Sequence, residues 1–254
     1  MIFMSSMHAD RGLQLLSADV ASRLEAFVFE GGFKPGDKLP SERELALQFG
    51  VSRTAIREGI KLLSQNGLLQ SSVGRGLFVG QLSTLPVLSS LNVLLQLGGG
   101  TLHDVVQVRN VLESLAARLA AENATEEELD ELSALVGEME EIRAAGGTYG
   151  VPGTPGPKFH IVMARASHNP LLAALIEPAM SLMNRGDSNP TQYLPGTARG
   201  VENHRRILNA LRARDADEAV AAVESHCQWL MDLRTENHPE WKTLSFDSSD
   251  QIRR

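Results

Sequence analysis

The sequence LPSERELALQFGVSRTAIRE at residues 39–58, followed by the tripeptide GRG at residues 74–76, indicates how the N-terminal part of this chain folds. Ser41 with Glu44 three residues later forms a capping box, which predicts a short helix that ends at Gly50. Only residues 50–52 separate this helix from the next one, and a three-residue turn with a glycine is typical of a helix-turn-helix.

The second helix of this pair has two different faces. Apolar residues recur at helical spacing from Ile56, whereas Arg53, Thr54 and Arg57 lie together on the other side near the N-terminus. Arginine can donate two hydrogen bonds to a guanine in the major groove, and threonine can contact base edges. The pattern therefore favours a recognition helix. Solvated arginines on a small helical domain are the simpler alternative.

The residues that follow predict a small antiparallel wing. Residues 68–73 and 77–79 have the composition of two strands, and Gly74-Arg75-Gly76 is a tight turn that places Arg75 at the tip. The whole pattern is that of a winged helix-turn-helix, whose wing lies near the minor groove.

The total charge alone would argue against nucleic-acid binding. The 254 residues include 24 Lys+Arg and 31 Asp+Glu, which gives a net charge of −7. Residues 1–80, however, hold nine basic and eight acidic side chains, whereas the remainder holds 15 basic and 23 acidic. The acidity therefore belongs to the C-terminal part. The length favours two domains.

Residues 39–46, 51–58 and 74–76 resemble the GntR family of bacterial transcription regulators. The resemblance implies that these residues contact operator DNA: Arg43, Ser52, Arg53, Thr54, Arg57, Gly74 and Arg75. Gly59 stands where the family usually has alanine, a difference that costs about 1 kcal/mol of helix propensity.

The rest of the chain predicts a mainly α protein, with an all-helical bundle after the winged helix-turn-helix. The expected domains are residues 1–80 for DNA binding, 81–100 as a linker with a short helix, 101–240 as the bundle and 241–254 as a tail. Helices are expected over residues 102–123, 125–145, 158–167, 170–185, 197–214 and 216–237.

Arg109 lies on an otherwise apolar stripe of the first bundle helix. A buried guanidinium without a partner would be costly. Two interpretations stay open: a local ion pair with Glu113 one turn later, or an anchor for a carboxylate ligand in the bundle.

Three histidines are expected to face the core. His204 and His226 stand level across an antiparallel helix hairpin if its turn is centred on Asp215, and His160 could supply a third nitrogen. Such a site suits Zn²⁺ or Ni²⁺. An inward histidine is, however, more often a core residue with satisfied hydrogen bonds. Cys227 is expected to pack in the core.

Several segments of residues 101–237, among them Phe159-His160 and Asn169-Pro170, resemble the FCD effector domain of the FadR-like branch of the GntR family. The resemblance implies a divalent metal held by one Asp and three His, with His160, His204 and His226 at the histidine positions. Gly156 stands where the Asp is expected.

Gly156 lies in a run, residues 146–157, in which eight of twelve residues are Gly or Pro. The helix that carries His160 is not expected to extend back through this run, and Pro157 is expected in its first turn. Three outcomes remain open: a three-His metal completed by water or the effector's carboxylate, a weaker metal site, or a pocket in which the histidines bind the ligand directly.

The single cysteine favours a reducing cytoplasm, and no signal peptide or membrane span is expected. The sequence thus predicts a cytoplasmic regulator, more often a repressor than an activator, that binds a palindromic operator as a homodimer. Its effector would be a small organic or sugar acid held by Arg109 and the three histidines. The alternatives are a metal-dependent enzyme that uses the three histidines and a ligand-independent DNA-binding protein.

Overall fold

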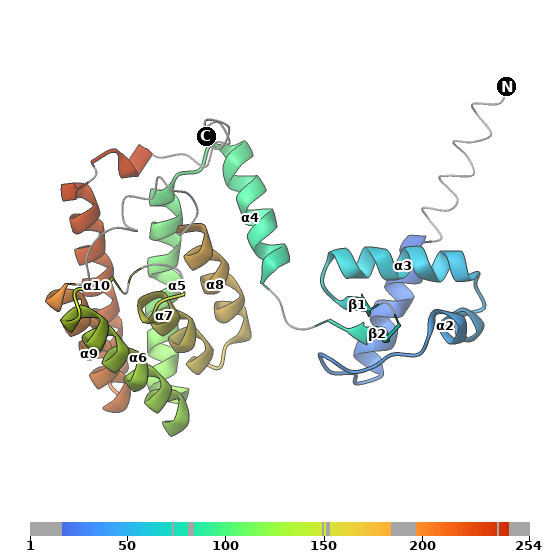
Figure 1. Ribbon diagram of the computed structural model, residues 1–254, viewed down its shortest axis with the longest axis horizontal. Coiled ribbons are helices and arrows are strands. Elements are labelled where there is room, and N and C mark those ends of the chain that lie inside the picture. The colour runs from blue at the N-terminus through green and yellow to red at the C-terminus, as the bar shows by residue number, and fades with distance from the viewer. Residues whose placement is uncertain are drawn as a thin grey trace. The chain divides into compact units, whose positions relative to one another are not determined.

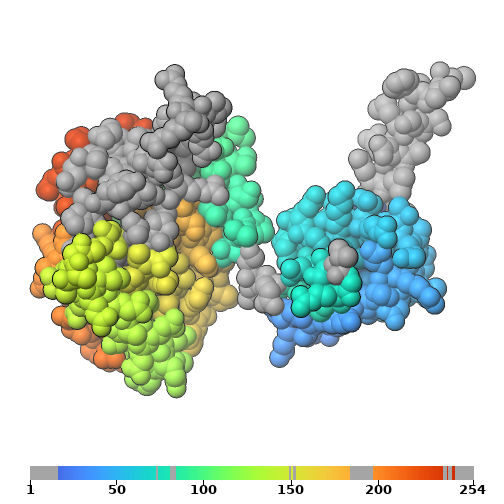
Figure 2. Space-filling view, in the orientation of Figure 1, coloured from blue at the N-terminus to red at the C-terminus, as the bar shows by residue number. Residues whose placement is uncertain are grey.

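The computed structural model describes residues 17–72, 74–80, 84–148, 150, 153–183, 197–237 and 239–243. The chain forms two compact units, Met1–Pro86 and Val87–Arg254. Figures 1 and 2 colour the first unit blue to cyan and the second unit green to red. Each unit has its own hydrophobic core.

The first unit contains a helix over residues 17–30, α2 (Glu42–Phe49) and α3 (Arg53–Gln65). The predicted capping box opens α2: the Ser41 N–H donates to the Glu44 carboxylate at 2.8 Å, and the Glu44 N–H donates to Ser41 Oγ at 3.3 Å. Gly50 closes α2 at a φ of 66°, a left-handed conformation that glycine adopts without strain. Ser52 then caps α3, so the predicted helix-turn-helix is confirmed.

The inner face of α3 packs closely against the helix over residues 17–30. A Cβ atom added to Gly59 would lie 2.8 Å from Val20 Cγ1 and 3.2 Å from the backbone nitrogen of Ala21. Both distances are too short for ordinary contact, so the missing side chain allows the two helices to approach. The glycine therefore has a packing role that offsets its poor helix propensity.

Two antiparallel strands, β1 (Leu69–Ser72) and β2 (Gly76–Val79), form the wing, with Leu69 opposite Val79 and Ser72 opposite Gly76. Positive φ angles of 75° at Gly74 and 111° at Gly76 make the turn. Lys38 bridges to Phe78 on the other edge of β2. The sheet thus ties the wing to the segment that precedes α2.

The second unit is a bundle in which α5 (Leu102–Asn123) contacts α7, α8, α9 and α10 (Figure 1). The other helices are α4 (Leu85–Gly98), α6 (Glu126–Ala144), α7 (Pro155–Ala166), α8 (Pro170–Met183), α9 (Ala198–Arg212), α10 (Ala216–Asn237) and a short 3-10 helix, η2 (Pro239–Thr243). The mainly α fold, with a winged helix-turn-helix and a helical bundle, is confirmed.

The expected start of α7 was wrong. The helix begins at Pro155 rather than Lys158, so Gly156 and Pro157 lie inside its first turn and are buried. Prolines fit there because the N–H groups of a first turn have no partner within the helix. Gly156 therefore stands one helical turn before His160 on the same helix.

Candidate functional site

The first candidate site is the exposed face of α3 with its neighbours. Arg53, Thr54 and Arg57 are exposed on α3, and Arg43 is exposed on α2. Ser52 is also exposed, and its hydroxyl accepts a hydrogen bond from the Ala55 N–H at 3.2 Å. At the turn of the wing, Gly74 and Arg75 are exposed. All seven residues expected to contact DNA are thus available on the surface of one unit.

Glu42 is a residue of this surface that the sequence did not single out. Its carboxylate accepts hydrogen bonds from Arg57 Nη2 at 2.9 Å and Arg57 Nε at 3.4 Å, and it lies 4.0 Å from Arg53 Nη2. The pair raises the pKa of the Arg57 guanidinium, mainly through the hydrogen bond. Glu42 therefore holds the Arg57 side chain on this face, and Arg53 lies close to the same carboxylate.

The second candidate site is a polar centre buried in the helical unit. Its members come from four different helices of the bundle, and each is at most 4% exposed. They are Arg109 and Glu113 on α5, His160 on α7, His204 on α9, and His226 and Arg234 on α10.

The three histidines converge in this centre. Their ring centroids lie 5.2 Å apart for His160 and His204, 5.1 Å for His160 and His226, and 4.5 Å for His204 and His226. One nitrogen from each ring lies within 4.8 Å of the other two. The hairpin of α9 and α10 thus brings two of the rings together, and α7 adds the third.

Two of the rings have an oxygen close to Nδ1, in a hydrogen bond for His204 and in a contact without hydrogen-bond alignment for His160. His204 Nδ1 lies 2.7 Å from the Gly200 carbonyl oxygen, and His160 Nδ1 lies 3.0 Å from Glu113 Oε2. Among the described residues, His204 Nε2 and both nitrogens of His226 are buried without a hydrogen-bond partner. A set of converging imidazole nitrogens with unused lone pairs fits a divalent ion of the zinc type.

Arg109 and Glu113 form the local ion pair that was one of the two interpretations of Arg109. Arg109 Nε lies 2.8 Å from Glu113 Oε1, and Arg109 Nη1 contacts Met183 Sδ at 2.8 Å. By distance Glu113 contacts both Arg109 and His160, but the N–H directions miss the oxygens, so neither contact is a well-aligned hydrogen bond.

The pKa values in this centre follow from burial and from the neighbouring charges. Burial would raise the pKa of Glu113, but Arg109 and His160 outweigh it and lower the pKa to about 2. Burial, followed by the repulsion of His160, lowers the pKa of His204 to about 3. Burial also lowers the pKa of His226 well below its usual value. Near neutral pH the centre holds an ionised Glu113 and neutral rings at His204 and His226.

Arg234 also lies in this centre, although it was not among the predicted site residues. Burial and the charge of Arg109 lower its pKa to about 9, so it is still a cation at neutral pH. Its position seven residues after Cys227, which is buried in the core, could have indicated an inward side chain. Among the described residues, two guanidinium groups and the carboxylate of Glu113 therefore lie in this centre.

Two known protein families match this chain, one in each of its two compact units. Residues 16–79 match the bacterial regulatory proteins of the gntR family, and residues 104–228 match the FCD domain. Both matches place the candidate sites described above in families of transcription regulators, not of enzymes. None of the helices in the described residues combines the length and the hydropathy of a membrane-spanning segment.

Individual relatives are similar over most of the chain. The HTH-type transcriptional regulator LutR of Bacillus subtilis is 33% identical over 81% of this chain and 95% of its own length. The Glc operon transcriptional activator of Escherichia coli is 29% identical over 86% of this chain and 90% of its own length. The HTH-type transcriptional repressor NanR of Klebsiella aerogenes is 32% identical over 83% of this chain and 82% of its own length.

Among solved structures, a GntR protein of Streptococcus agalactiae superposes with a TM-score of 0.64 at 26% identity, over 85% of this chain and 99% of that one. The relatives include both an activator and a repressor. Sequence motifs, fold and relatives agree: this chain belongs to the GntR family of transcription regulators and carries a C-terminal FCD domain.

Proposed function

We propose that this effector-responsive regulator is a cytoplasmic repressor that binds a palindromic operator as a homodimer and responds to a small carboxylate. The single observation that supports a carboxylate effector is the position of Arg109, a buried guanidinium in the same centre as the three histidines. A guanidinium can bind a carboxylate with two parallel hydrogen bonds.

The proposal also includes a divalent metal bound to the three histidines. His160, His204 and His226 would hold the ion, with Zn²⁺ or Ni²⁺ the best match to imidazole ligands. A bound metal would supply a Lewis acid that holds an oxygen of the ligand. Organic acids and sugar acids both have the carboxylate that this site requires.

The surface of α5 supports a homodimer. Its inner side packs in the bundle, yet Val108, Val111 and Leu115 are 60%, 71% and 45% exposed along its outer side. A helix that is apolar on both sides is normally covered on both. A second copy of the chain would cover this stripe symmetrically, and a two-fold dimer would present two α3 helices to two half-sites.

The mechanism we propose is allosteric coupling. An acid bound between α5, α7, α9 and α10 would favour one packing of these helices, and the linked DNA-binding units would then match or miss the spacing of the half-sites. Arg53, Thr54 and Arg57 would read the bases, and Arg75 would contact the adjacent groove.

Operator binding tests the DNA part of this proposal. DNA selected from random sequence by the protein itself serves as the operator, and binding is measured by fluorescence anisotropy. Arg53→Ala should weaken binding to this operator by about 1–3 kcal/mol and weaken binding to random DNA less. Arg212→Ala, an exposed change in the helical unit, is the matched control. Equal losses on both DNAs would contradict a base contact by Arg53.

Thermal denaturation with a panel of organic and sugar acids tests the effector part. An effector should raise the midpoint of the transition and change operator affinity, whereas its amide should do neither. Arg109→Gln should abolish both responses because the anchoring charge is lost. If operator binding is intact and no acid has either effect, the chain is a ligand-independent DNA-binding protein instead.

A further inference from the structure

We infer that Lys38 is a further DNA contact of the first unit and binds a backbone phosphate beside the wing. The inference rests on DNA binding by this unit, and it goes beyond the seven residues that the family resemblance implies. Three observations lead to it: the strand that carries Lys38, the path of its side chain across the wing turn, and the engagement of the neighbouring acids by other groups.

The segment before α2 lies along the free edge of the wing sheet. Lys38 bridges to Phe78 in antiparallel register, and the Leu39 N–H donates to the Leu77 carbonyl oxygen at 2.9 Å. Successive residues of a strand point to opposite faces, and Leu39 and Leu77 are both buried in the core of the unit. Lys38 and Phe78 therefore share the outer face of the sheet.

The side chain of Lys38 crosses the wing turn. Its Cε atom lies 3.3 Å from the position that a Cβ atom would take at Gly76. A side chain at position 76 would obstruct this path, so the glycine admits the lysine as well as the turn. The ammonium group is bonded to Cε and therefore lies beside the exposed turn that carries Arg75.

Lys38 is exposed and has no ion-pair partner in the described part of the chain. The acidic side chains that follow or precede it closely in the sequence bind other groups: Asp37 the Lys34 N–H, Glu42 the Arg57 guanidinium, and Glu44 the Ser41 N–H. An ammonium group without a counter-ion is free to bind a phosphate, which lysine contacts as a point charge.

Lys38 also stands between two expected DNA contacts of the same unit. Arg75 lies at the wing turn on one side, and α2, which carries Arg43, begins four residues after Lys38 on the other. Phosphate contacts fix the position of a protein on the duplex and carry no sequence information. Lys38 would therefore hold the wing against the DNA backbone and add affinity without adding selectivity.

Salt titrations of the full-length protein test this role by fluorescence anisotropy, with the selected operator and with random DNA. Lys38→Gln should reduce the steepness of log affinity against log salt by about 0.9, the value for one phosphate contact. At about 0.1 M salt the affinity should fall by about fivefold to tenfold, by the same factor on both DNAs. Lys38→Arg should keep the wild-type salt dependence, because it keeps the charge.

Lys34→Gln is the matched control, since it removes the same charge from the same segment. Lys34 is exposed in a turn with Asp37, at the end of the sheet away from the wing turn, so its loss should change the salt dependence less than half as much. Thermal denaturation verifies that the variants fold. Acetylation of the wild-type protein by an amine-reactive reagent, read by mass spectrometry, needs no variant: bound DNA should protect Lys38 and not Lys34.

The outcomes separate this inference from the proposed function. An unchanged salt dependence for Lys38→Gln, or equal acetylation of Lys38 with and without DNA, would overturn the phosphate contact and leave DNA binding by α3 intact. A loss confined to the operator would overturn it as well, because a phosphate contact is independent of sequence. If the wild-type protein binds neither DNA, the proposed DNA-binding function itself fails.

Discussion

Glu42 is an acidic residue on a surface that is expected to face phosphates, and its contacts explain its presence. It is bound to Arg57 through both carboxylate oxygens and lies near Arg53. A guanidinium held in this way loses less side-chain freedom when it meets a base, which favours selective contacts. The same carboxylate reduces the attraction to the DNA backbone, which is independent of sequence. Glu42 should therefore increase selectivity and lower general affinity.

Glu42→Gln should raise the affinity for random DNA by about threefold to tenfold, because a negative charge near the phosphates is removed. The ratio of operator affinity to random-DNA affinity should fall, since Arg57 is less restrained. Titrations of both DNAs at several salt concentrations measure the two effects. Glu58→Gln on α3, whose carboxylate lies 3.8 Å from Lys61, is the control. An unchanged affinity ratio would show that Glu42 does not orient the arginines.

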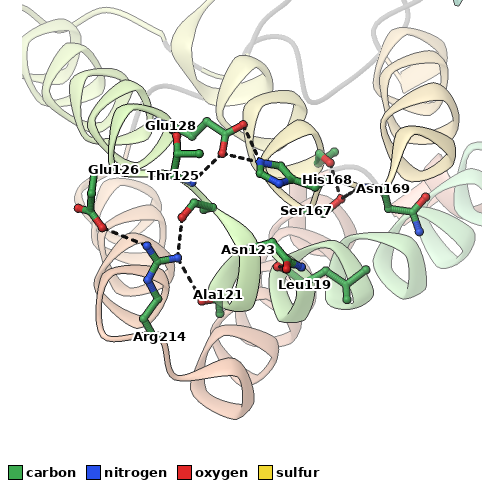
Figure 3. A network of polar contacts seen from close by, with 12 residues as sticks. Leu119, Ala121, Asn123, Thr125, Glu126, Glu128, Ser167, His168, Asn169 and Arg214 are labelled. Carbon is green, nitrogen blue, oxygen red and sulfur yellow. Dashed lines mark hydrogen bonds and ion pairs between the residues drawn. The ribbon is translucent and has the colours of Figure 1, made fainter.

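At the scale of the elements, polar contacts join the loops at one end of the bundle (Figure 3). Arg214, between α9 and α10, donates to the carbonyl oxygen of Ala124 at 2.7 Å and contacts Glu126 at 3.0 Å. Arg214 has a φ of 57°, a conformation that costs a non-glycine residue energy. The contacts of its side chain at the end of α5 compensate for this backbone strain.

Two substitutions at position 214 separate these effects. Arg214→Ala should lower the free energy of unfolding by about 1–3 kcal/mol, because a carbonyl loses its donor and the strained φ persists. Arg214→Gly loses the same contacts but relieves the strain, so it should be about 1 kcal/mol more stable than Arg214→Ala. Chemical denaturation of both variants gives the two values. A glycine variant less stable than the alanine variant would contradict the strain at this position.

Glu128 belongs to the same network of polar contacts, and its ionisation makes the stability of the helical bundle depend on pH. Burial would raise its pKa, but hydrogen bonds from the Thr125 backbone and from His168 outweigh burial and lower it. A carboxyl group with a lowered pKa in the folded state stabilises the fold above its unfolded pKa, and this contribution is lost as the pH falls through the folded value.

Glu128→Gln should therefore lower the melting temperature at pH 6, where the wild-type carboxylate is ionised. The difference between the two proteins should shrink as the pH falls below about 4, near the unfolded pKa of glutamate. Thermal melts over this pH range give the difference directly. A difference that stays constant would mean that the ionisation of Glu128 does not contribute.

At the scale of the whole molecule, the outer stripe of α5 predicts the assembly. Val111→Asp places a charge at the centre of this stripe and should raise the dissociation constant of a homodimer by about tenfold or more, because the charge would be buried without a partner. Sedimentation of the variant and of Ala134→Asp, an exposed change on α6, measures the effect. Val111→Asp should also weaken binding to a palindromic operator more than binding to a half-site. Equal sedimentation of both variants and the wild-type protein would place the interface elsewhere.

The helices and strands and their order could be predicted from the amino-acid sequence. The caps at Ser41, Ser52 and Thr125, the glycine turn and the apolar periodicity of each helix all act within a few residues. Such local signals are readable from the chain because the interactions that produce them are local. The inward placement of three histidines followed from the same periodicity. The start of α7 was the exception, because prolines that usually end a helix also fit its first turn.

The contacts between side chains of different helices could not be predicted in the same way. Glu42 and Arg57 lie on two helices that cross, and Glu113 reaches His160 only because α5 and α7 pack together. Arg234 joins the centre through the packing of α10 on α5. These contacts depend on the angles and separations between elements. The packing of many side chains sets those distances, and no spacing along the chain encodes them.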